Sequence, residues 1–223
     1  LVFAGGSEAA VTPVSLAAFG NMTALSSTDT SRPFDVARDG FVIAEGAAVL
    51  VLEEWSSAEA RGATILAEVL GSASTADAHH ITAPSPGGEG AIRCMRLAIE
   101  DAGLTPADIT YINAHGTSTP LNDKAEAEAV AAVFGTPGPA ISSIKGVTGH
   151  SLGAAGAREA ASVVLSVQHR AIPPTLGFET PDPELPALDL VTGEPREWEP
   201  GPTISNSFGF GGHNGSLVLG PGA

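Results

Sequence analysis

Apolar segments of strand length alternate with amphipathic segments of helical period through the middle of the chain. The predicted strands cover residues 65–71, 109–114 and 139–145, and the predicted helices cover residues 90–103, 124–134 and 153–168. Each strand leads through a loop into a helix. Strands that alternate with helices are typical of an α/β fold, in which helices cover a sheet. We therefore predict an α/β fold.

The first sixty residues follow a different pattern. In order, they predict a strand end, a long polar loop, a continuous apolar strand and a short helix, over residues 1–6, 23–40, 41–55 and 56–62. The apolar strand lacks alternation, as expected of a strand that is covered on both faces. The helix ends at Gly62, a residue typical of helix C-termini. We place a boundary there, between residues 1–62 and 63–223.

The C-terminal part contains an irregular segment and then a hairpin. Residues 173–202 hold many prolines and few periodic apolar positions, which predicts a surface connection that adds no core element. Residues 203–210 and 216–220 predict two strands joined by a glycine-rich turn. The chain is expected to close on this hairpin.

Composition narrows the function classes. The net charge of −15 over 223 residues argues against a nucleic-acid surface, which needs clustered Lys and Arg. The single cysteine, Cys94, excludes an intrachain disulfide framework and suits a reducing cytoplasm. No apolar run reaches the roughly 18–20 residues of a membrane span, and no signal peptide opens the chain. We expect a globular cytoplasmic protein.

A histidine follows the strand predicted at residues 109–114, in the sequence NAHGTSTP at residues 113–120. Loops at the carboxyl ends of strands carry the ligand-binding residues of α/β sheets. His115 could instead be a structural residue that hydrogen-bonds the neighbouring hydroxyls. Its position favours a functional role.

A second histidine lies in KGVTGHSLGAAG, at residues 145–156. Residues 149–153 match G-x-S-x-G, the nucleophile elbow of serine hydrolases and acyltransferases, so Ser151 is a candidate nucleophile. However, a polar loop at residues 145–148 separates Ser151 from the preceding strand. We favour Ser151 as a helix N-cap and His150 as the functional residue.

A third loop, SNSFGFGGHN at residues 205–214, places Phe208 and Phe210 beside glycines. Glycine lets the backbone approach another segment or a ligand closely. On its own this loop would be interpreted as a hairpin turn with core aromatics.

Together with DAHHITAP at residues 77–84, these loops resemble the elongating, type II β-ketoacyl-[acyl carrier protein] synthases. Further motifs occur in the order that the family shows, namely AGGSE at residues 4–8, SRPFD at 31–35, RDGF at 38–41 and LVLEE at 50–54. The resemblance covers nearly the whole chain. It implies a thiolase-like, layered αβαβα fold, of which residues 1–62 would form the end of the N-terminal half and residues 63–223 the C-terminal half.

The resemblance also implies a mechanism, the decarboxylative condensation of an acyl thioester with malonyl-carrier protein in fatty acid or polyketide synthesis. By motif, His115 and His150 match the two histidines that stabilise the enolate. Lys145 matches the active-site lysine, paired with Glu159 and ordering the histidines. The remaining matches are Thr117 and Thr119 for the pantetheine arm, Phe210 for a gating aromatic that also helps form the oxyanion hole, and Phe208 in support.

The nucleophilic cysteine of the family has no match in this chain. Cys94 lies within a predicted helix beside Met95 and Ala98 and is expected to be an inert, buried thiol. In the family, the acylated cysteine precedes the AGGSE strand. We therefore expect another chain or segment to supply an N-terminal half, and no condensation by this chain alone.

The expected partners are acyl carrier protein and a second copy of the complete enzyme. No cofactor is expected, because the substrates are carried on phosphopantetheine, and no metal is expected, because no His or carboxylate spacing suits a metal site. Two alternatives remain, a serine acyltransferase that uses Ser151 and a non-catalytic subunit like the chain-length factors. The presence of both histidines argues against the non-catalytic subunit.

Overall fold

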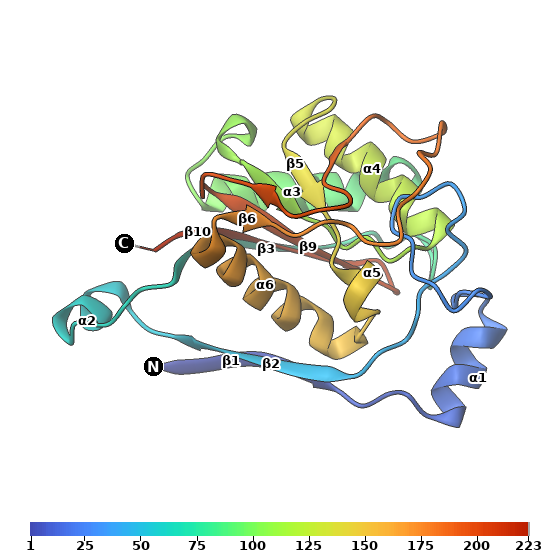
Figure 1. The fold of residues 1–223 in the computed structure, drawn as a ribbon, viewed down its shortest axis with the longest axis horizontal. Helices are drawn as coiled ribbons and strands as arrows, with labels where there is room; N and C mark the ends of the chain where they lie inside the picture. The colour runs from blue at the N-terminus through green and yellow to red at the C-terminus, as the bar shows by residue number, and fades with distance from the viewer. Residues whose placement is uncertain (223) are drawn as a thin grey trace.

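The computed structural model describes residues 1–222 and is built around a six-stranded mixed sheet (Figure 1). The strand order is β3, β10, β9, β4, β5, β7. The strands are β3 Ala67–Ala76, β4 Tyr111–Asn113, β5 Ala140–Ser142, β7 Asp189–Leu190, β9 Thr203–Gly209 and β10 His213–Pro221. β9, β4, β5 and β7 are mutually parallel, whereas β10 is antiparallel to both β3 and β9. The carboxyl ends of β4, β5 and β9 therefore meet at one edge of the sheet.

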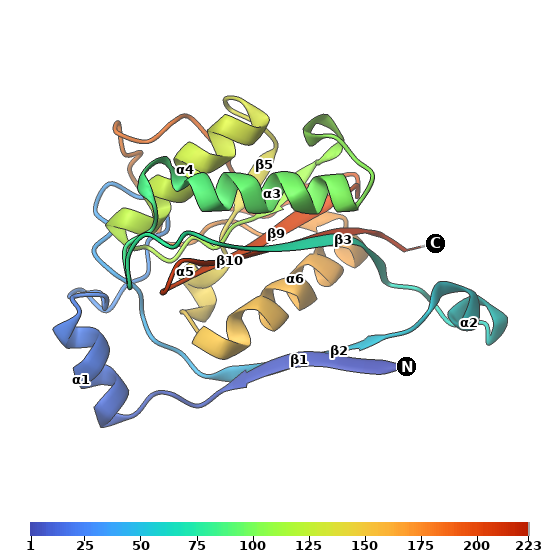
Figure 2. The same ribbon diagram turned by 180° about the vertical axis from the view of Figure 1, so that it is seen from behind.

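Helices cover both faces of this sheet. α3, Glu89–Asp101, and α4, Pro120–Phe134, lie on one face, and α6, Ala155–His169, lies on the other (Figures 1 and 2). Beyond α6 is an antiparallel pair, β1 Val2–Glu8 and β2 Gly46–Leu52. The shorter elements are α1 Pro13–Asn21, α2 Trp55–Ala60, α5 Lys145–Thr148, β6 Ala171–Ile172 and β8 Arg196–Glu197. The order of layers is thus helices, sheet, helix and strand pair.

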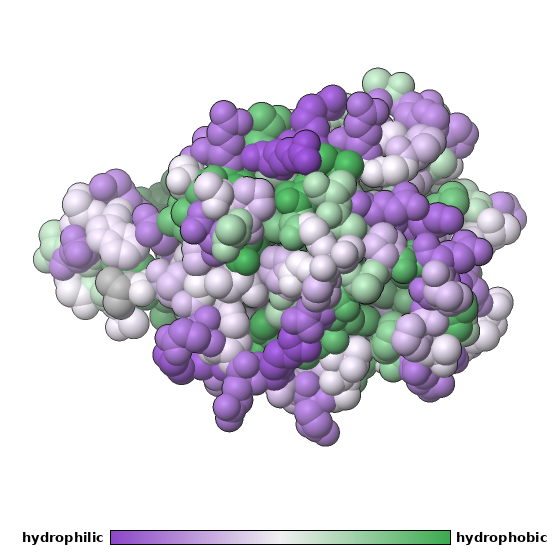
Figure 3. Space-filling model, turned by 90° about the horizontal axis from the view of Figure 1, so that it is seen from above, coloured by the Kyte–Doolittle hydropathy of each residue, from purple (hydrophilic) through white to green (hydrophobic). Residues whose placement is uncertain are grey.

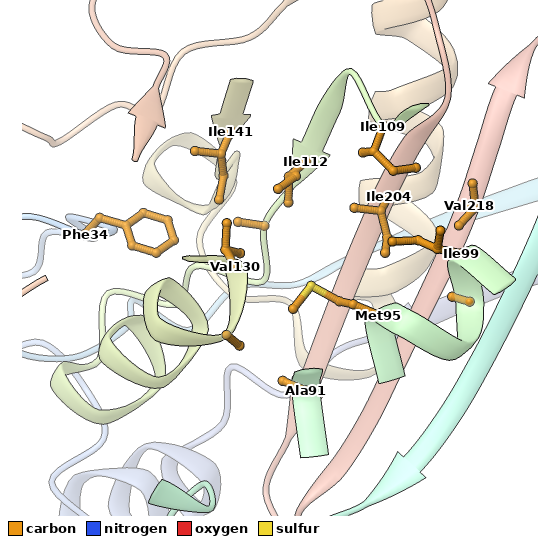
Figure 4. Close-up of a cluster of buried hydrophobic side chains, with 13 residues drawn as sticks. Phe34, Ala91, Met95, Ile99, Ile109, Ile112, Val130, Ile141, Ile204 and Val218 are labelled. Carbon is orange, nitrogen blue, oxygen red and sulfur yellow. The ribbon is translucent and has the colours of Figure 1, made fainter. Parts of the chain in front are cut away.

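The main core lies between the sheet and the helices α3 and α4 (Figure 4). Met95 and Ile99 project from α3 onto Ile204 of β9, and all three side chains are at most 2% exposed. Residues four apart lie on one face of a helix, which explains why α3 buries this stripe. Phe34, from the loop that precedes β2, enters the same core. The core therefore joins that loop to the sheet.

The strand pair β1–β2 covers α6 with one face only. Leu50 packs into the cluster that α6 forms with the sheet. On the opposite face, Phe3 is 76% exposed, Val49 63% and Val51 59%. These three side chains form an exposed apolar face on the outer side of the strand pair.

The surface over α3 and α4 differs from that apolar face. Viewed from above, hydrophilic and hydrophobic residues are interspersed there, and α2 projects from the body (Figure 3). Within residues 1–222, no helix combines the length and the hydrophobicity that a membrane span requires.

The predicted alternation of strands and helices is confirmed, as is the C-terminal hairpin, formed by β9 and β10. The single strand predicted over residues 41–55 is wrong, because β2 begins only at Gly46. Ile43, in the earlier part of the run, bridges His150 instead of β1. The apolar run is therefore divided between two partners.

Two further predictions are corrected. The connection 173–202 does add a core element, since β7 extends the sheet and Val191 is 1% exposed. The predicted polar loop at residues 145–148 is the short helix α5. Helix α1 was not predicted, although Thr12 caps it and Pro13 occupies its first turn, both common signals of a helix start. The boundary near Gly62 stays a prediction.

Candidate active site

The two histidines singled out in the sequence lie side by side. The ring centroids of His115 and His150 are 5.4 Å apart, and their planes are nearly perpendicular. Both rings line a cavity of about 520 Å³. The cavity is also lined by the predicted residues Thr117, Thr119, Phe208 and Phe210. The fold thus brings together residues from three separate loops.

Parallel strands place these loops. Asn113 of β4 pairs with Ser142 of β5, and the Ala114 N–H donates to the Ser142 carbonyl at 2.9 Å. His115 and Lys145 follow directly, so both leave the sheet at the same edge. Gly116 has a φ of +37°, and a Cβ there would lie 2.5 Å from the Cβ of Ser143. Only glycine lets the two loops approach so closely.

Lys145 links the two sides of the site. Its side chain is 1% exposed and forms a buried ion pair with Glu159 of α6, the contact that the family resemblance implied. The same Nζ donates to the His115 carbonyl at 2.5 Å and lies 3.4 Å from Nδ1 of that ring. Because an ammonium group can only donate, Nδ1 of His115 accepts, and the ring proton is on Nε2.

Different contacts hold the His150 ring in the same tautomer. Its backbone N–H donates to Val42 O at 2.8 Å, and its carbonyl accepts from the Ala44 N–H at 3.0 Å. Its Nδ1 accepts the N–H of Leu152 at 3.3 Å. The proton of this ring is therefore also on Nε2. Both rings offer one N–H donor each, on the nitrogen that these contacts leave free.

The surroundings keep both rings neutral. Burial, followed by the charge of Lys145 and electrostatic interaction with the neighbouring His150, lowers the pKa of His115 well below 6.5. Burial and the charge of Lys145 lower the pKa of His150 to about 3. Aromatic rings contribute to this burial. The ring centroid of Phe41 lies 5.1 Å from that of His150, and the ring centroid of Phe208 lies 6.1 Å from that of His115. The pair can donate hydrogen bonds to an anion without carrying charge.

The lowered pKa of His150 predicts a pH dependence of stability. Between pH 6.5 and pH 3 the unfolded state binds one more proton at this residue than the folded state, so stability falls as the pH falls through that window. At about 1.4 kcal/mol per pH unit, the loss between pH 7 and pH 5 is about 2 kcal/mol. His150→Asn should remove this contribution. Urea unfolding of both proteins at the two pH values tests it, and equal losses would contradict the lowered pKa.

Two buried carboxylates beneath the His115 loop were not predicted as site residues. Glu126 of α4 accepts the N–H groups of His115 and Gly116 at 2.8 and 2.7 Å. Asp123, also on α4, accepts from Thr117 N at 3.0 Å and Phe34 N at 2.8 Å. Burial raises the pKa of both groups, that of Glu126 to about 7. Their spacing of three residues, on one side of a predicted helix, was the available signal.

The other predicted residues surround the cavity. The hydroxyls of Thr117 and Thr119 are 2.9 Å apart, and Thr119 also caps α4. Phe210 is 45% exposed at the turn between β9 and β10. A second cavity, of about 370 Å³, shares Phe208, Phe210 and Thr119 with the first and extends towards Met22. Phe208 and Phe210 therefore lie between the two cavities.

Ser151 and Cys94 are not placed for nucleophilic attack at this cavity. Ser151 is 1% exposed and occupies the predicted N-cap position, of a short 3₁₀ helix, but its side chain forms no capping hydrogen bond there. Neither residue is among those that line the cavity. Cys94 is fully buried, as predicted, and its thiol donates to Ala73 O at 3.4 Å.

Two family models match the chain. "Beta-ketoacyl synthase, C-terminal domain" matches residues 66–179, and "Beta-ketoacyl synthase, N-terminal domain" matches residues 1–58. The chain therefore belongs to the beta-ketoacyl synthase family.

Two curated relatives carry the name 3-oxoacyl-[acyl-carrier-protein] synthase 2. That of Synechocystis sp. is 49% identical over 222 residues, which cover 96% of this chain and 53% of the relative. That of Staphylococcus aureus is 48% identical over 221 residues, which cover 96% of this chain and 55% of the relative. The chain spans about half the length of the curated relatives it matches.

Solved structures show the same fold. A beta-ketoacyl synthase from Burkholderia phymatum superposes with a TM-score of 0.93 at 43% identity, over 98% of this chain and 54% of the other. The ishigamide ketosynthase/chain length factor superposes with a TM-score of 0.93 at 41% identity, over 98% of this chain and 53% of the other. A type II polyketide ketosynthase, in complex with its acyl carrier protein, superposes with a TM-score of 0.95 at 37% identity, over 98% of this chain and 55% of the other. These matches confirm the predicted thiolase-like α/β fold.

Proposed function

We propose that this chain forms the enolate-stabilising part of a ketosynthase that condenses an acyl thioester with a malonyl thioester on acyl carrier protein. The observation that carries the proposal is the pair of neutral rings, His115 and His150, each with a free Nε2–H beside one cavity. Such donors are suited to an oxygen that gains negative charge during the reaction.

In the proposed reaction, the malonyl group loses its carboxylate as carbon dioxide. The electron pair of the broken C–C bond moves into the thioester and forms an enolate. The Nε2–H groups of His115 and His150 hold the enolate oxygen. The enolate carbon then attacks the carbonyl of the acyl thioester, a new C–C bond forms, and the thiolate of the acylated cysteine leaves. Neither histidine has to give up a proton in these steps.

The acylated cysteine would come from an N-terminal ketosynthase segment, and we call this chain together with that segment the assembled enzyme. The relatives are about twice as long as the matched region, and the apolar face of Phe3, Val49 and Val51 is a surface that such a segment could cover. The assembled enzyme would act on substrates carried by phosphopantetheine, without a further cofactor, and would form a dimer.

The remaining predicted residues take positions that fit the substrate arm. The paired hydroxyls of Thr117 and Thr119 could hydrogen-bond the pantetheine, whose amides offer donors and acceptors. Phe210, which lies next to Gly209 and Gly211, would gate the passage between the two cavities, and its backbone N–H would serve the oxyanion of the acyl thioester. Phe208 closes one side of the His115 ring.

Condensation by the assembled enzyme tests the proposal against the serine acyltransferase. Ser151→Ala should leave acyl transfer and condensation within about twofold of the wild type, because Ser151 does not line the cavity and its side chain makes no capping bond. Product formation from malonyl- and acyl-carrier protein is the measurement. If Ser151→Ala abolished acyl transfer while histidine variants retained it, the ketosynthase proposal would be wrong.

A further inference from the structure

The turn that follows His150 contains a strained residue. Leu152 has a φ of +43°, in the left-handed region, which a branched side chain rarely adopts. The N–H of this same residue donates to Nδ1 of His150. Strained backbone persists only where the surrounding structure holds it, and it is frequent at functional sites. Some other group must therefore hold this turn.

The last residue of β1 provides that support. One carboxylate oxygen of Glu8, Oε2, accepts the N–H of Gly153 at 3.1 Å, and the other, Oε1, accepts the N–H of Ala9 at 3.1 Å. Glu8 thus joins the end of β1 to the residue directly after Leu152. The two segments are also in close contact, since a Cβ on Gly6 would lie 2.4 Å from the carbonyl oxygen of Gly153.

The register of β1 fixes where this carboxylate lies. Glu8 pairs with Gly46 at the start of β2, and the segment just before Gly46 holds the backbone of His150 through Val42 and Ala44. The carboxylate also faces the first N–H groups of the helical segment that leads into α6, where a negative charge is favourable. Glu8 itself does not line the cavity.

We infer that Glu8 is a positioning residue for His150. By holding Gly153, it keeps Leu152 in the left-handed conformation in which its N–H reaches Nδ1. That hydrogen bond confines the ring proton to Nε2 and fixes the direction of the donor. The inference about the ring proton rests on geometry alone, whereas its effect on turnover also rests on the proposed function.

The test compares Glu8 variants in the assembled enzyme, produced with ¹⁵N-labelled histidine rings. In the wild type, the His150 ring should show one protonated nitrogen, Nε2, and one unprotonated nitrogen, Nδ1. Glu8→Ala should make the Nδ1–H tautomer detectable. Glu8→Asp keeps the charge, but its side chain is one methylene too short to reach Gly153, so it should change the tautomer as Glu8→Ala does. This variant replaces Glu8→Ala if the alanine variant does not fold. The His150→Asn spectrum assigns the resonances.

A conservative variant, Glu8→Gln, and a matched control, Glu54→Ala, distinguish an effect on the position of His150 from an effect on overall stability. Glu8→Gln keeps an oxygen that can accept from Gly153 and should retain the wild-type tautomer. Glu54 accepts the N–H of Ser57 at the start of α2, beyond the opposite end of β2, so it makes the same kind of contact elsewhere. Glu54→Ala should lower Tm without changing the His150 resonances.

Turnover gives a second readout. Glu8→Ala should lower kcat by about tenfold with little change in KM, which is the lower end of the loss seen when the partner of a metal-ligating histidine is removed. A folded Glu8→Ala or Glu8→Asp protein with wild-type His150 resonances would overturn the inference. A tautomer change without any loss of turnover would support the positioning role and count against the proposed use of the Nε2–H donor.

Discussion

Replacing His115 with alanine is expected to lower the turnover of malonyl thioester by the assembled enzyme about 10²- to 10³-fold. The ring supplies one of two N–H donors beside the cavity, and its neutral state is maintained by burial and by Lys145. Without it the enolate oxygen keeps only the donor of His150. Carbon dioxide release and condensation should fall together, because both depend on the same enolate.

The control for this loss is His79→Ala. His79 is exposed in the loop after β3 and does not line the cavity, so its replacement should leave both rates within about twofold. Rates of carbon dioxide release and of product formation are the measurements. A His115→Ala enzyme with near-normal carbon dioxide release would contradict the assignment of this ring to the enolate.

The second large effect concerns stability. Lys145→Met is expected to lower the free energy of unfolding by about 3–5 kcal/mol, because it leaves the buried carboxylate of Glu159 without its partner. The other carboxylate oxygen of Glu159, Oε2, already lacks a hydrogen-bond partner among the described residues. The stability of the buried carboxylate therefore depends strongly on its ion pair with Lys145. The midpoint of urea unfolding, compared with wild type at the same pH, measures the loss.

Two variants check the cause of that loss. The double variant Lys145→Met with Glu159→Leu removes both charges and fills similar volume, so it should recover most of the stability. Lys124→Met breaks an exposed ion pair with Glu184 and should change stability by less than about 1 kcal/mol. A double variant that remained as unstable as Lys145→Met would show that lost packing, rather than the unpaired charge, causes the effect.

Local sequence patterns were sufficient for the parts of the site that parallel strands position. Residues 114–116 and 143–145 follow β4 and β5, which end at one edge of the sheet. The strand–loop–helix pattern was sufficient to place His115 at that edge, whereas the role of Lys145 was implied by the family resemblance. The ion pair with Glu159 was predicted only through the family resemblance, because no helical or strand period relates Lys145 of α5 to Glu159 of α6.

The features that the sequence did not predict depend on tertiary contacts. The apolar run 41–55 looks like one strand, but its first part pairs with the His150 turn and only its second part with β1. Likewise, the left-handed Leu152 and its support by Glu8 join segments that are 144 or more positions apart, and no local pattern reports such a contact. Tertiary pairing overrides the period of the sequence at these places.

The close contact of the two histidine-bearing loops has a consequence for engineering. Gly116 has no room for a side chain against Ser143, and a Cβ on Gly146 would lie 2.0 Å from the carbonyl oxygen of Leu176. Libraries that randomise these loops should therefore yield few active variants. Met22 and Leu121 line the second cavity away from the two rings, so libraries at these positions should leave the contact between the loops intact.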